Sequence, residues 1–377
     1  MAAHAERREK LTMSDRTWSI SERLTGLRER AERSGHRVID LGQGSPSDPT
    51  PTLITEELAA ASDWPGYPPA HGLPSLRNSY CQWVLRRWGA VLPEEDVCTT
   101  VGSKEFIATL PWFLGLGSSD LVVVPELAYP TYAAGAHLAG CQTVSAPPEV
   151  AVLDELRPKL LWLNTPGNPT GEVLSGSHLA EIVAWARDKN VVVVSDECYV
   201  ELTPPGPPAK SILSPEITGD DLTNVLAVHS LSKRSNMAGY RIGFASGDSD
   251  LVAGLVRLRR DAGLIAAGPI QMAASKALAD DQHVFRLQEE YAERRDVLRQ
   301  GLIRAGFQIQ HSEAGLFVWA TEGQSDIDTS TRMADLGILV APGSFYGVKG
   351  EWHVRLSLTT SLPDLEEVGA RLLLAEK

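Results

Sequence analysis

The sequence NVLAVHSLSKRSNMAGYRIGF, residues 224–244, begins with an apolar run and continues into charged and small residues. Residues 225–228 are uninterrupted apolar residues, which is typical of a strand buried on both faces of a parallel sheet. Lys233 ends this run, after two serines and before two arginines. Arg234 should repel so close a lysine, and the small residues around them offer little packing. The stretch therefore indicates a buried strand that ends at functional side chains.

Similar apolar runs occur three more times, and each ends in polar or turn-forming residues. They are DLVVVPE at 120–126, KLLWLNTPGNPTG at 159–171 and VVVVSDECY at 191–199. Between the last two, a serine followed by helically spaced apolar residues predicts a helix over 175–190. Repeated strand–helix–strand units predict an α/β fold with a mostly parallel sheet and a site at the carboxyl ends of its strands.

The pattern changes after about Gly268. The charged sequence QHVFRLQEEYAERRDVLRQGLIRAG, residues 282–306, predicts a long helix, and several short strand-like segments follow it. One helix followed by short strands is typical of a smaller α+β domain. We therefore expect four parts: a disordered extension at 1–14, an N-terminal arm at 15–45 that joins the small domain, a large domain at 46–268 and a small domain at 269–377.

The composition limits the classes of function. The chain has 377 residues, 43% of them hydrophobic and 22% charged, and its net charge is −13. The acidic charge argues against nucleic acid or an anionic membrane as a partner. The charged N-terminus lacks the apolar core of a signal peptide, and no apolar run approaches the ~18 residues of a membrane span. We expect a cytoplasmic protein. The four cysteines lack paired metal-site spacing, so we expect neither a metal nor a disulfide framework.

Three successive strand ends carry polar residues: Asn164 with Asn168, then Asp196, then Lys233. Each has an ordinary alternative, because asparagines suit turns, an aspartate can cap a turn, and most lysines are exposed. However, a carboxylate that follows a buried strand is costly without a cation, and a buried lysine tends to become a neutral nucleophile. A lysine for covalent attachment and an acid for a pyridinium nitrogen are the combination that pyridoxal phosphate enzymes use. The sequence therefore predicts pyridoxal 5'-phosphate as cofactor.

Eight motifs then make the chain similar to a known family. They are LGQGSP (41–46), YPPAHGLPSLR (67–77), GSKEFI (102–107), PELAYPTY (125–132), NTPGNPTG (164–171), SDECY (195–199), SLSKRSNMAGYRIG (230–243) and HVRLSL (353–358). With these motifs in this order, the chain resembles the fold-type I, class I aminotransferases over nearly everything after Ile39. The resemblance implies a cofactor-binding large domain, a small domain, and a homodimer acting on amino acids and 2-oxo acids.

The resemblance also implies the catalytic residues. Lys233 would bind the cofactor aldehyde covalently and later carry the proton. Asp196 would keep the pyridine nitrogen protonated. Tyr199 and Asn168 would donate hydrogen bonds to the oxygen on the cofactor ring, and Tyr129 would stack on that ring.

Further residues are implied at the ends of the cofactor and of the substrate. The phosphate would be bound by Gly102, Ser103, Lys104 (mainly through its backbone), Ser230 and Arg241. Tyr67 would reach the phosphate of the neighbouring subunit, so that two chains share each site. Gly44, Asn168 and Arg355 would bind the substrate, and Arg355 would hold its α-carboxylate with Gly44 beside it. Arg234 has no role in this scheme, and we expect it to face solvent or a second subunit. Gly239 and Gly243 would let the backbone turn close to the site.

The substrate is less constrained. Over the whole chain the resemblance is greatest to the actinobacterial N-succinyldiaminopimelate aminotransferases, on LGQGSPSDPTP (41–51) and APGSFYG (341–347). It implies transfer from glutamate to N-succinyl-2-amino-6-oxopimelate in lysine and diaminopimelate biosynthesis. The alternatives are an aminotransferase for aspartate, alanine or aromatic amino acids, a carbon–sulfur β-lyase of the same fold, and a non-enzymatic ligand sensor. The residues before the motifs are too few for the DNA-binding domain that such a sensor usually carries.

Overall fold

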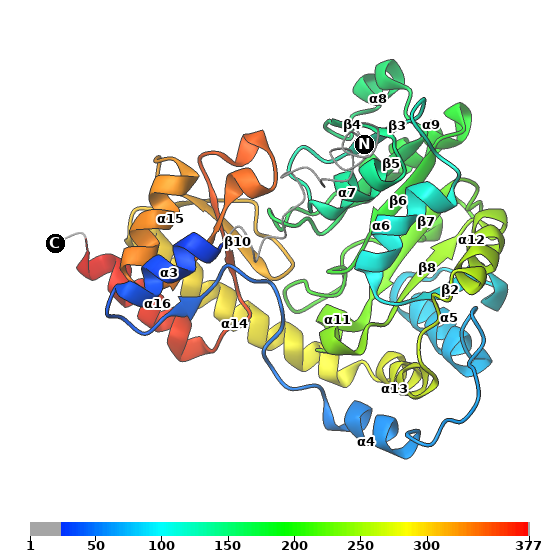
Figure 1. Ribbon diagram of the computed structural model, residues 1–377, viewed down its shortest axis with the longest axis horizontal. Helices are drawn as coiled ribbons and strands as arrows, with labels where there is room; N and C mark the ends of the chain where they lie inside the picture. The colour runs from blue at the N-terminus through cyan, green and yellow to red at the C-terminus, as the bar shows by residue number, and fades with distance from the viewer. Residues whose placement is uncertain (1–23, 376–377) are drawn as a thin grey trace, which may run out of the picture.

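The computed structural model describes residues 24–375. A seven-stranded sheet and a smaller four-stranded sheet lie in separate bodies (Figure 1), each with a hydrophobic cluster of its own. The predicted extension at 1–14 and the start of the predicted arm lie outside the described residues.

The large sheet is mostly parallel, as predicted. Strand β8 runs antiparallel to both its neighbours, whereas the remaining pairs of the sheet are parallel. In spatial order the strands are β2 (Val97–Thr100), β8 (Gly243–Gly247), β7 (Val225–Ser230), β6 (Val192–Asp196), β5 (Leu160–Asn164), β3 (Leu121–Val124) and β4 (Gln142–Ser145).

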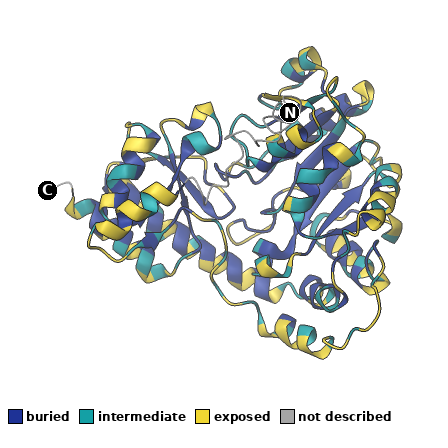
Figure 2. Ribbon diagram, viewed as in Figure 1, coloured by how far each residue is buried: buried dark blue, intermediate teal, exposed yellow. Residues whose placement is uncertain are grey.

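Alternate residues of the central strands bury into two different cores, which explains the uninterrupted apolar runs. Leu161 and Leu163 belong to the cluster made with α5, α9 and α13, whereas Leu160 and Trp162 belong to the cluster made with α6, α7 and α12. Figure 2 shows these strands as buried along their length. The helices of this body are α4 (Thr52–Ala60), α5 (Pro74–Trp88), α6 (Ser103–Phe113), α7 (Thr131–Leu138), α8 (Val150–Leu156), α9 (Gly176–Lys189), α10 (Pro215–Thr218), α11 (Leu231–Arg234), α12 (Ser249–Asp261) and α13 (Gly268–Ala279).

The predicted helix over 175–190 is present as α9. Its N-cap is Ser175, whose side chain accepts a hydrogen bond from the backbone N–H of His178, so the capping signal in the sequence was informative.

The small body contains an antiparallel sheet and a parallel two-stranded pair. The antiparallel order is β12 (Ala341–Pro342), β13 (Val354–Ser357), β10 (Phe317–Thr321) and β9 (Gln308–Gln310), and the pair joins β1 (Ile39–Asp40) to β11 (Ile338–Leu339). Strand β1 belongs to the predicted N-terminal arm, so this arm contributes to the small body. The helices are α3 (Thr25–Arg33), α14 (Gln282–Arg304), α15 (Asp326–Asp335) and α16 (Leu362–Leu374).

The boundary expected between residues 268 and 269 falls too early. Helix α13 follows this boundary, yet its buried residues pack in the core of the large sheet. The core changes only with α14, which starts beside α13 and runs to the small body (Figure 1). The charged sequence of α14 was easy to recognise, whereas the alanine-rich face of α13 gives no sign of which sheet it covers.

The carboxyl ends of β5, β6 and β7 lie side by side. Asn164 at the end of β5 pairs in register with Asp196 at the end of β6. Strand β7 ends at Ser230, and Lys233 lies in the short helix α11 rather than on the strand as predicted. The short 3-10 helices are η2 (Glu94–Asp96), η3 (Ala238–Tyr240), η4 (Gly343–Phe345) and η5 (Val348–Gly350).

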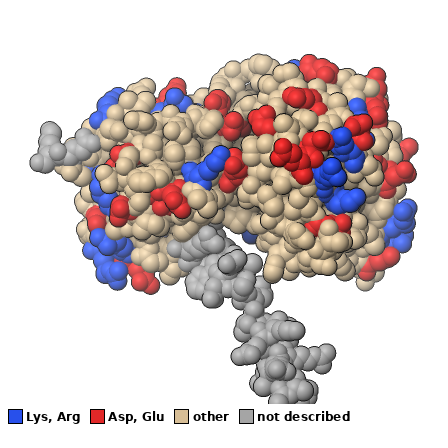
Figure 3. All heavy atoms as spheres, turned by 90° about the horizontal axis from the view of Figure 1, so that it is seen from above, with Lys and Arg blue, Asp and Glu red and all other residues tan. Residues whose placement is uncertain are grey.

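The surface shows no strong segregation of charge on the face seen in Figure 3, where acidic and basic side chains are interspersed. Between residues 24 and 375, no helix is long and apolar enough to cross a membrane. The same residues contain no cluster of His, Cys, Asp or Glu that could hold a metal ion.

Candidate active site

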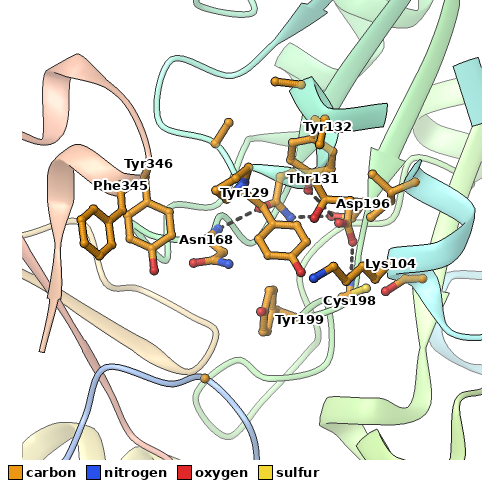
Figure 4. A pocket seen from close by; sticks show the side chains of 18 of the residues that line it. Lys104, Tyr129, Thr131, Tyr132, Asn168, Asp196, Cys198, Tyr199, Phe345 and Tyr346 are labelled. Atoms are coloured by element: carbon orange, nitrogen blue, oxygen red, sulfur yellow. Dashed lines mark hydrogen bonds between the residues drawn. The ribbon is translucent and has the colours of Figure 1, made fainter. Parts of the chain in front are cut away.

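A cavity of about 1240 Å³ lies at the carboxyl ends of the central strands and is lined by residues of both bodies. The sequence-predicted residues that line it are Gly44, Ser103, Lys104, Tyr129, Asn168, Asp196, Tyr199, Ser230, Lys233, Arg241 and Arg355. Figure 4 shows Tyr129 between the side chains of Asp196 and Asn168, with Phe345 and Tyr346 approaching from the small body. Residues from both ends of the described chain therefore meet in one space.

Lys233 reaches the cavity from α11. Its Nζ donates a hydrogen bond to the backbone carbonyl of Gly44. Burial, together with the charges of Arg355 and Arg241, lowers the pKa of Lys233 to about 8. An amine with this pKa is neutral in roughly a tenth of the molecules at pH 7, far more than an ordinary lysine, so it can act as a nucleophile and as a base.

Asp196 is a buried carboxylate with no cation beside it among the described residues. Its side chain is held by hydrogen bonds from Tyr132 Oη at 2.7 Å and from the backbone N–H of Cys198 at 3.2 Å. Burial raises the pKa of Asp196, although these two donors oppose the rise. A buried acid of this kind gains most from a cationic or N–H partner supplied by a ligand.

A third group of residues forms a cradle for an anion at the start of α6. Gly102 has a φ of +77° and precedes the helix, and the first two helix residues, Ser103 and Lys104, line the cavity. A Cβ at Gly102 would lie 2.2 Å from Arg241 Nη2, so only glycine allows the guanidinium this close to the backbone. Arg241 donates at 2.8 Å to the carbonyl of Ala238, and no described carboxylate pairs with it. Free N–H groups and an unpaired cation favour a phosphate.

Arg355 lies on β13 and is 3% exposed. Its Nη1 donates to Asn168 Oδ1 at 2.9 Å, and its Nη2 donates to the carbonyl of Gly42 at 2.6 Å. The rings of Phe317 and Tyr346 lie 4.1 Å and 5.0 Å from the guanidinium carbon. Its Nε has no hydrogen-bond partner, and no described acid neutralises its charge.

Of the three predicted tyrosines, Tyr199 and Tyr129 line the cavity in different places. Tyr199 is buried, which raises its pKa well above the usual value, and its ring meets Phe317 edge-on at 5.7 Å. Tyr129 meets Tyr132 edge-on at 6.1 Å, and Lys104 Nζ lies 5.9 Å from the centre of the Tyr129 ring. Tyr129 itself lines the cavity.

The residues of the site that were missed from the sequence include Tyr132, Cys198, Phe317 and Tyr346. Tyr132 follows Tyr129 by one helical turn in AYPTY, and this spacing could have indicated a second tyrosine facing the same strands. Cys198 and Tyr346 lie in the motifs SDECY and APGSFYG, where the sequence drew attention to other residues, and Phe317 lies in an apolar segment typical of a core strand.

Two predicted positions lie away from the cavity of this chain. Tyr67 is fully exposed and does not line it. Arg234 is 3% exposed and pairs with the buried carboxylate of Glu201, so the expectation that it faces solvent or a second subunit is wrong. Of the two predicted glycines, Gly243 is closely packed, whereas a Cβ at Gly239 would meet open space. Gly243 alone is therefore needed for close approach.

The family profile described as "Aminotransferase class I and II" matches residues 36–372. The chain belongs to this family of aminotransferases. Its members depend on pyridoxal phosphate, and so does this protein. Three features fit that cofactor: no described cation pairs with Asp196, no described carboxylate pairs with Arg241 beside the start of α6, and burial lowers the pKa of Lys233 to about 8, which makes its amine easier to deprotonate.

Named relatives of this aminotransferase differ in substrate. It is 46% identical over 357 residues to the 4-dedimethylamino-4-oxo-anhydrotetracycline transaminase OxyQ of Streptomyces rimosus, covering 94% of this chain and 98% of that protein. It is 34% identical to the LL-diaminopimelate aminotransferase of Dehalococcoides mccartyi strain CBDB1 over 360 residues, covering 90% and 91%. Among solved structures, a probable N-succinyldiaminopimelate aminotransferase from Thermus thermophilus superposes with a TM-score of 0.86 at 28% identity, covering 95% and 100%. These matches establish the fold-type I aminotransferase fold.

Proposed function

We propose that Lys233, Asp196 and the α6 cradle hold pyridoxal phosphate in the cavity. Lys233 is the residue for the aldehyde, since it combines a lowered pKa with a place in the cavity. In this proposal Asp196 pairs with the pyridine nitrogen. The phosphate is bound by Gly102, Ser103, Lys104, Ser230 and Arg241. Tyr129 supplies a ring face for stacking, while Tyr199 and Asn168 are donors for the ring oxygen.

When bound, this cofactor supplies an electron sink for the carbon from which a proton is removed. Lys233 then takes that proton and returns it, for which a pKa of about 8 is well suited near neutral pH. Asp196 holds a proton on the ring nitrogen, because a buried carboxylate is stabilised by a cationic partner. Tyr132 and the backbone of Cys198 hold Asp196 in place for this task.

The environment of Arg355 is the observation that best supports an amino acid as substrate. A buried guanidinium with no acid partner is unfavourable unless an anion arrives from outside. Its contacts with Asn168 and Gly42 fix its plane, and the rings of Phe317 and Tyr346 exclude water around it. The α-carboxylate of an amino acid or 2-oxo acid fits such a planar, bidentate donor. Gly44 lies beside this position, with its backbone against the Phe317 ring.

For the second substrate we propose N-succinyl-2-amino-6-oxopimelate, which receives the amino group of glutamate to give N-succinyl-LL-2,6-diaminopimelate and 2-oxoglutarate. The diaminopimelate aminotransferases among the relatives support this substrate class. The cavity supports it as well, because it is large and its wall includes the Lys104 amine, which has no carboxylate partner among the described residues. A succinyl carboxylate would pair with that amine.

A second candidate for the acceptor substrate is a polycyclic ketone such as 4-dedimethylamino-4-oxo-anhydrotetracycline, the compound in the name of OxyQ. The identity of 46% over nearly the whole of that protein favours it. The two candidates differ in charge: the succinylated acid needs a distal cation, whereas a polycyclic ketone needs mainly apolar surface. Tyr129, Phe345 and Tyr346 would provide such surface.

The deciding experiment supplies the cofactor-loaded enzyme with glutamate and one acceptor at a time, and measures 2-oxoglutarate and the aminated product by mass spectrometry. The acceptors are the succinylated oxopimelate, its unsuccinylated form, pyruvate and 4-dedimethylamino-4-oxo-anhydrotetracycline. We expect the highest kcat/KM with the succinylated acid. The K104M substitution should lower kcat/KM for that acceptor and leave the values for the other acceptors unchanged. A preference for the tetracycline would replace the first candidate. Release of a thiol from cystathionine would instead indicate β-lyase chemistry.

We also propose a homodimer in which Tyr67 completes the site of the partner subunit. Tyr67 is fully exposed on the isolated chain, and a phenol that is wholly in water gains a buried environment on association.

A further inference from the structure

Arg234 directly follows Lys233 on the four-residue helix α11, yet the two side chains go to different places. Lys233 Nζ reaches the carbonyl of Gly44 in the cavity, whereas the Arg234 guanidinium lies in the protein interior at 3% exposure. Consecutive residues of a helix are turned by about 100° from each other, which allows this divergence. The sequence suggested that Arg234 would repel Lys233. Because Arg234 lies in the interior, it does not repel the lysine from the cavity.

The Arg234 guanidinium has three different kinds of partner. Nε donates to the carboxylate of Glu201, and Nη1 donates to the carbonyl of Ala277 at 3.0 Å and to Ser235 Oγ at 3.2 Å. The Trp83 ring centre lies 5.4 Å from the guanidinium carbon. These contacts use the fixed fork of the guanidinium, which a lysine cannot reproduce.

Glu201 is itself fixed on its other sides. It is 2% exposed, and Trp83 Nε1 donates to its Oε2 at 3.0 Å. Arg87 Nε lies 2.8 Å from its Oε1, close enough for an ion pair although not aligned as a hydrogen bond. A buried carboxylate between two arginines and an indole has little freedom to move, so it is a rigid anchor for Arg234.

The anchor extends to the junction of α13 and α14. Ala277 belongs to the last turn of α13, and Ser235 Oγ lies 2.9 Å from Nε2 of His283 in the first turn of α14. His283 Nδ1 is in turn 2.6 Å from Asp280 Oδ2. The turn that carries Lys233 is thus attached from behind to helices that come much later in the chain.

Helix α11 has little stability of its own. It is one turn long, and a single turn has the unfavourable free energy of helix nucleation without the favourable free energy of propagation. Its direction must therefore come from its surroundings. Arg234 attaches this turn to other segments through its ion pair with Glu201 and its hydrogen bond to the Ala277 carbonyl.

We propose that Arg234, clamped by Glu201, Ala277 and Ser235, is a positioning residue that directs the Lys233 amine into the cavity. This rests on the proposed role of Lys233 in holding the cofactor. Arg234 touches neither cofactor nor substrate in this scheme, and it acts through the orientation of α11. Without the clamp, the turn would relax and the lysine amine would gain access to water.

The test measures the amine itself. The full-length chain is stripped of cofactor, exposed to an amine-acylating reagent at a series of pH values, and the Lys233 peptide is quantified by mass spectrometry. In the wild type the rate should level off above a pKa of about 8. In R234M the pKa should rise towards 10.5, slowing acylation at pH 7 by roughly tenfold or more, since each unit is a factor of ten. R234K keeps the charge for Glu201 but not the fork, so it should fold well and show an intermediate shift.

The matched control is R371M. Arg371 is also a buried arginine that donates to backbone carbonyls, those of Arg37 and Leu336, but it lies in the small body away from the cavity. We expect R371M to lower the melting temperature while leaving the Lys233 profile unchanged. An unchanged profile in both Arg234 variants would overturn the proposal, and so would an equal shift in R371M, because either result makes Arg234 merely structural.

A second measurement separates this proposal from the one on which it rests. Wild-type protein is mixed with pyridoxal phosphate, reduced with borohydride and mapped by peptide mass spectrometry. Failure to label Lys233 would remove the proposed role of Lys233 itself. Labelling of Lys233 in the wild type, with equally rapid labelling in R234M and R234K, would contradict only the positioning role of Arg234.

Discussion

Arg355 Nη1 donates a hydrogen bond to Asn168 Oδ1 at 2.9 Å, and this contact joins the small sheet to the loop after β5. The amide oxygen is used by the arginine, so the amide N–H₂ group of Asn168 is left to donate towards the cavity. One asparagine can therefore serve both the proposed substrate anchor and the proposed cofactor site.

Replacing Arg355 tests the substrate anchor. R355Q should raise the KM for glutamate by roughly tenfold to a hundredfold, since a charge-assisted hydrogen bond to a buried carboxylate is worth about 1.5–3 kcal/mol. Steady-state kinetics with glutamate as the varied substrate provides the measurement. R332Q is the control, because Arg332 pairs with Glu322 in the small body and does not line the cavity. An unaltered KM in R355Q would rule out Arg355 as the carboxylate anchor.

Replacing Lys233 tests the proposed nucleophile and proton carrier. K233A should still bind the cofactor through Asp196 and the α6 cradle, but turnover should fall by several orders of magnitude because both functions of the amine are lost. Equilibrium dialysis with pyridoxal phosphate measures the binding, and product formation measures the turnover. Near-normal turnover in K233A would exclude the assignment.

Asp196 and its tyrosine partner should differ in their effects. D196N keeps the size of the side chain but removes its charge, so we expect a rate loss of about a hundredfold or more, which is a few kcal/mol of barrier. Y132F removes one hydrogen bond to Asp196 and should cost only several-fold, since such a bond contributes about 1 kcal/mol. Rates and melting temperatures are compared for both variants. If D196N melts earlier but remains fully active, then Asp196 is structural.

The lowered pKa of Lys233 has a consequence for the stability of the cofactor-free protein. Between a folded pKa of about 8 and an unfolded value of 10.5, the unfolded chain binds the extra proton, so this lysine makes stability rise with pH. K233M lacks this contribution. The free energy of unfolding of the wild type relative to K233M should therefore increase, by up to about 3 kcal/mol, as pH rises from about 7 to about 10.5.

Urea unfolding of both proteins at several pH values measures this difference. Other titrating groups are common to the two proteins and cancel in the comparison. A constant difference across the range would show that the folded protein does not perturb the lysine.

The sequence predicted the central strands well because their apolar runs have a single physical explanation, burial on both faces. It also predicted that Asn168, Asp196 and Lys233 lie close together, since they follow successive strands and parallel strands end at one edge, and all three line the cavity. It failed where the answer depends on distant partners. Arg234 looked exposed because nothing near it in the sequence is acidic, whereas its carboxylate partner Glu201 comes from another loop. The alanines of α13 likewise gave no sign of which core they join.

The shared site is tested by mixing two defective variants, Y67A and K233A. If Tyr67 serves the partner subunit, a mixed dimer has one site with both defects and one site with neither. After statistical exchange about half of the dimers are mixed, so activity should return to about a quarter of the wild-type level. Exchange is verified independently by native mass spectrometry with one variant isotopically labelled. No recovery despite verified exchange would place Tyr67 in the site of its own chain or outside the site. Its complete exposure in the single chain makes the first of these outcomes hard to reconcile with the cavity, from whose wall Tyr67 is absent.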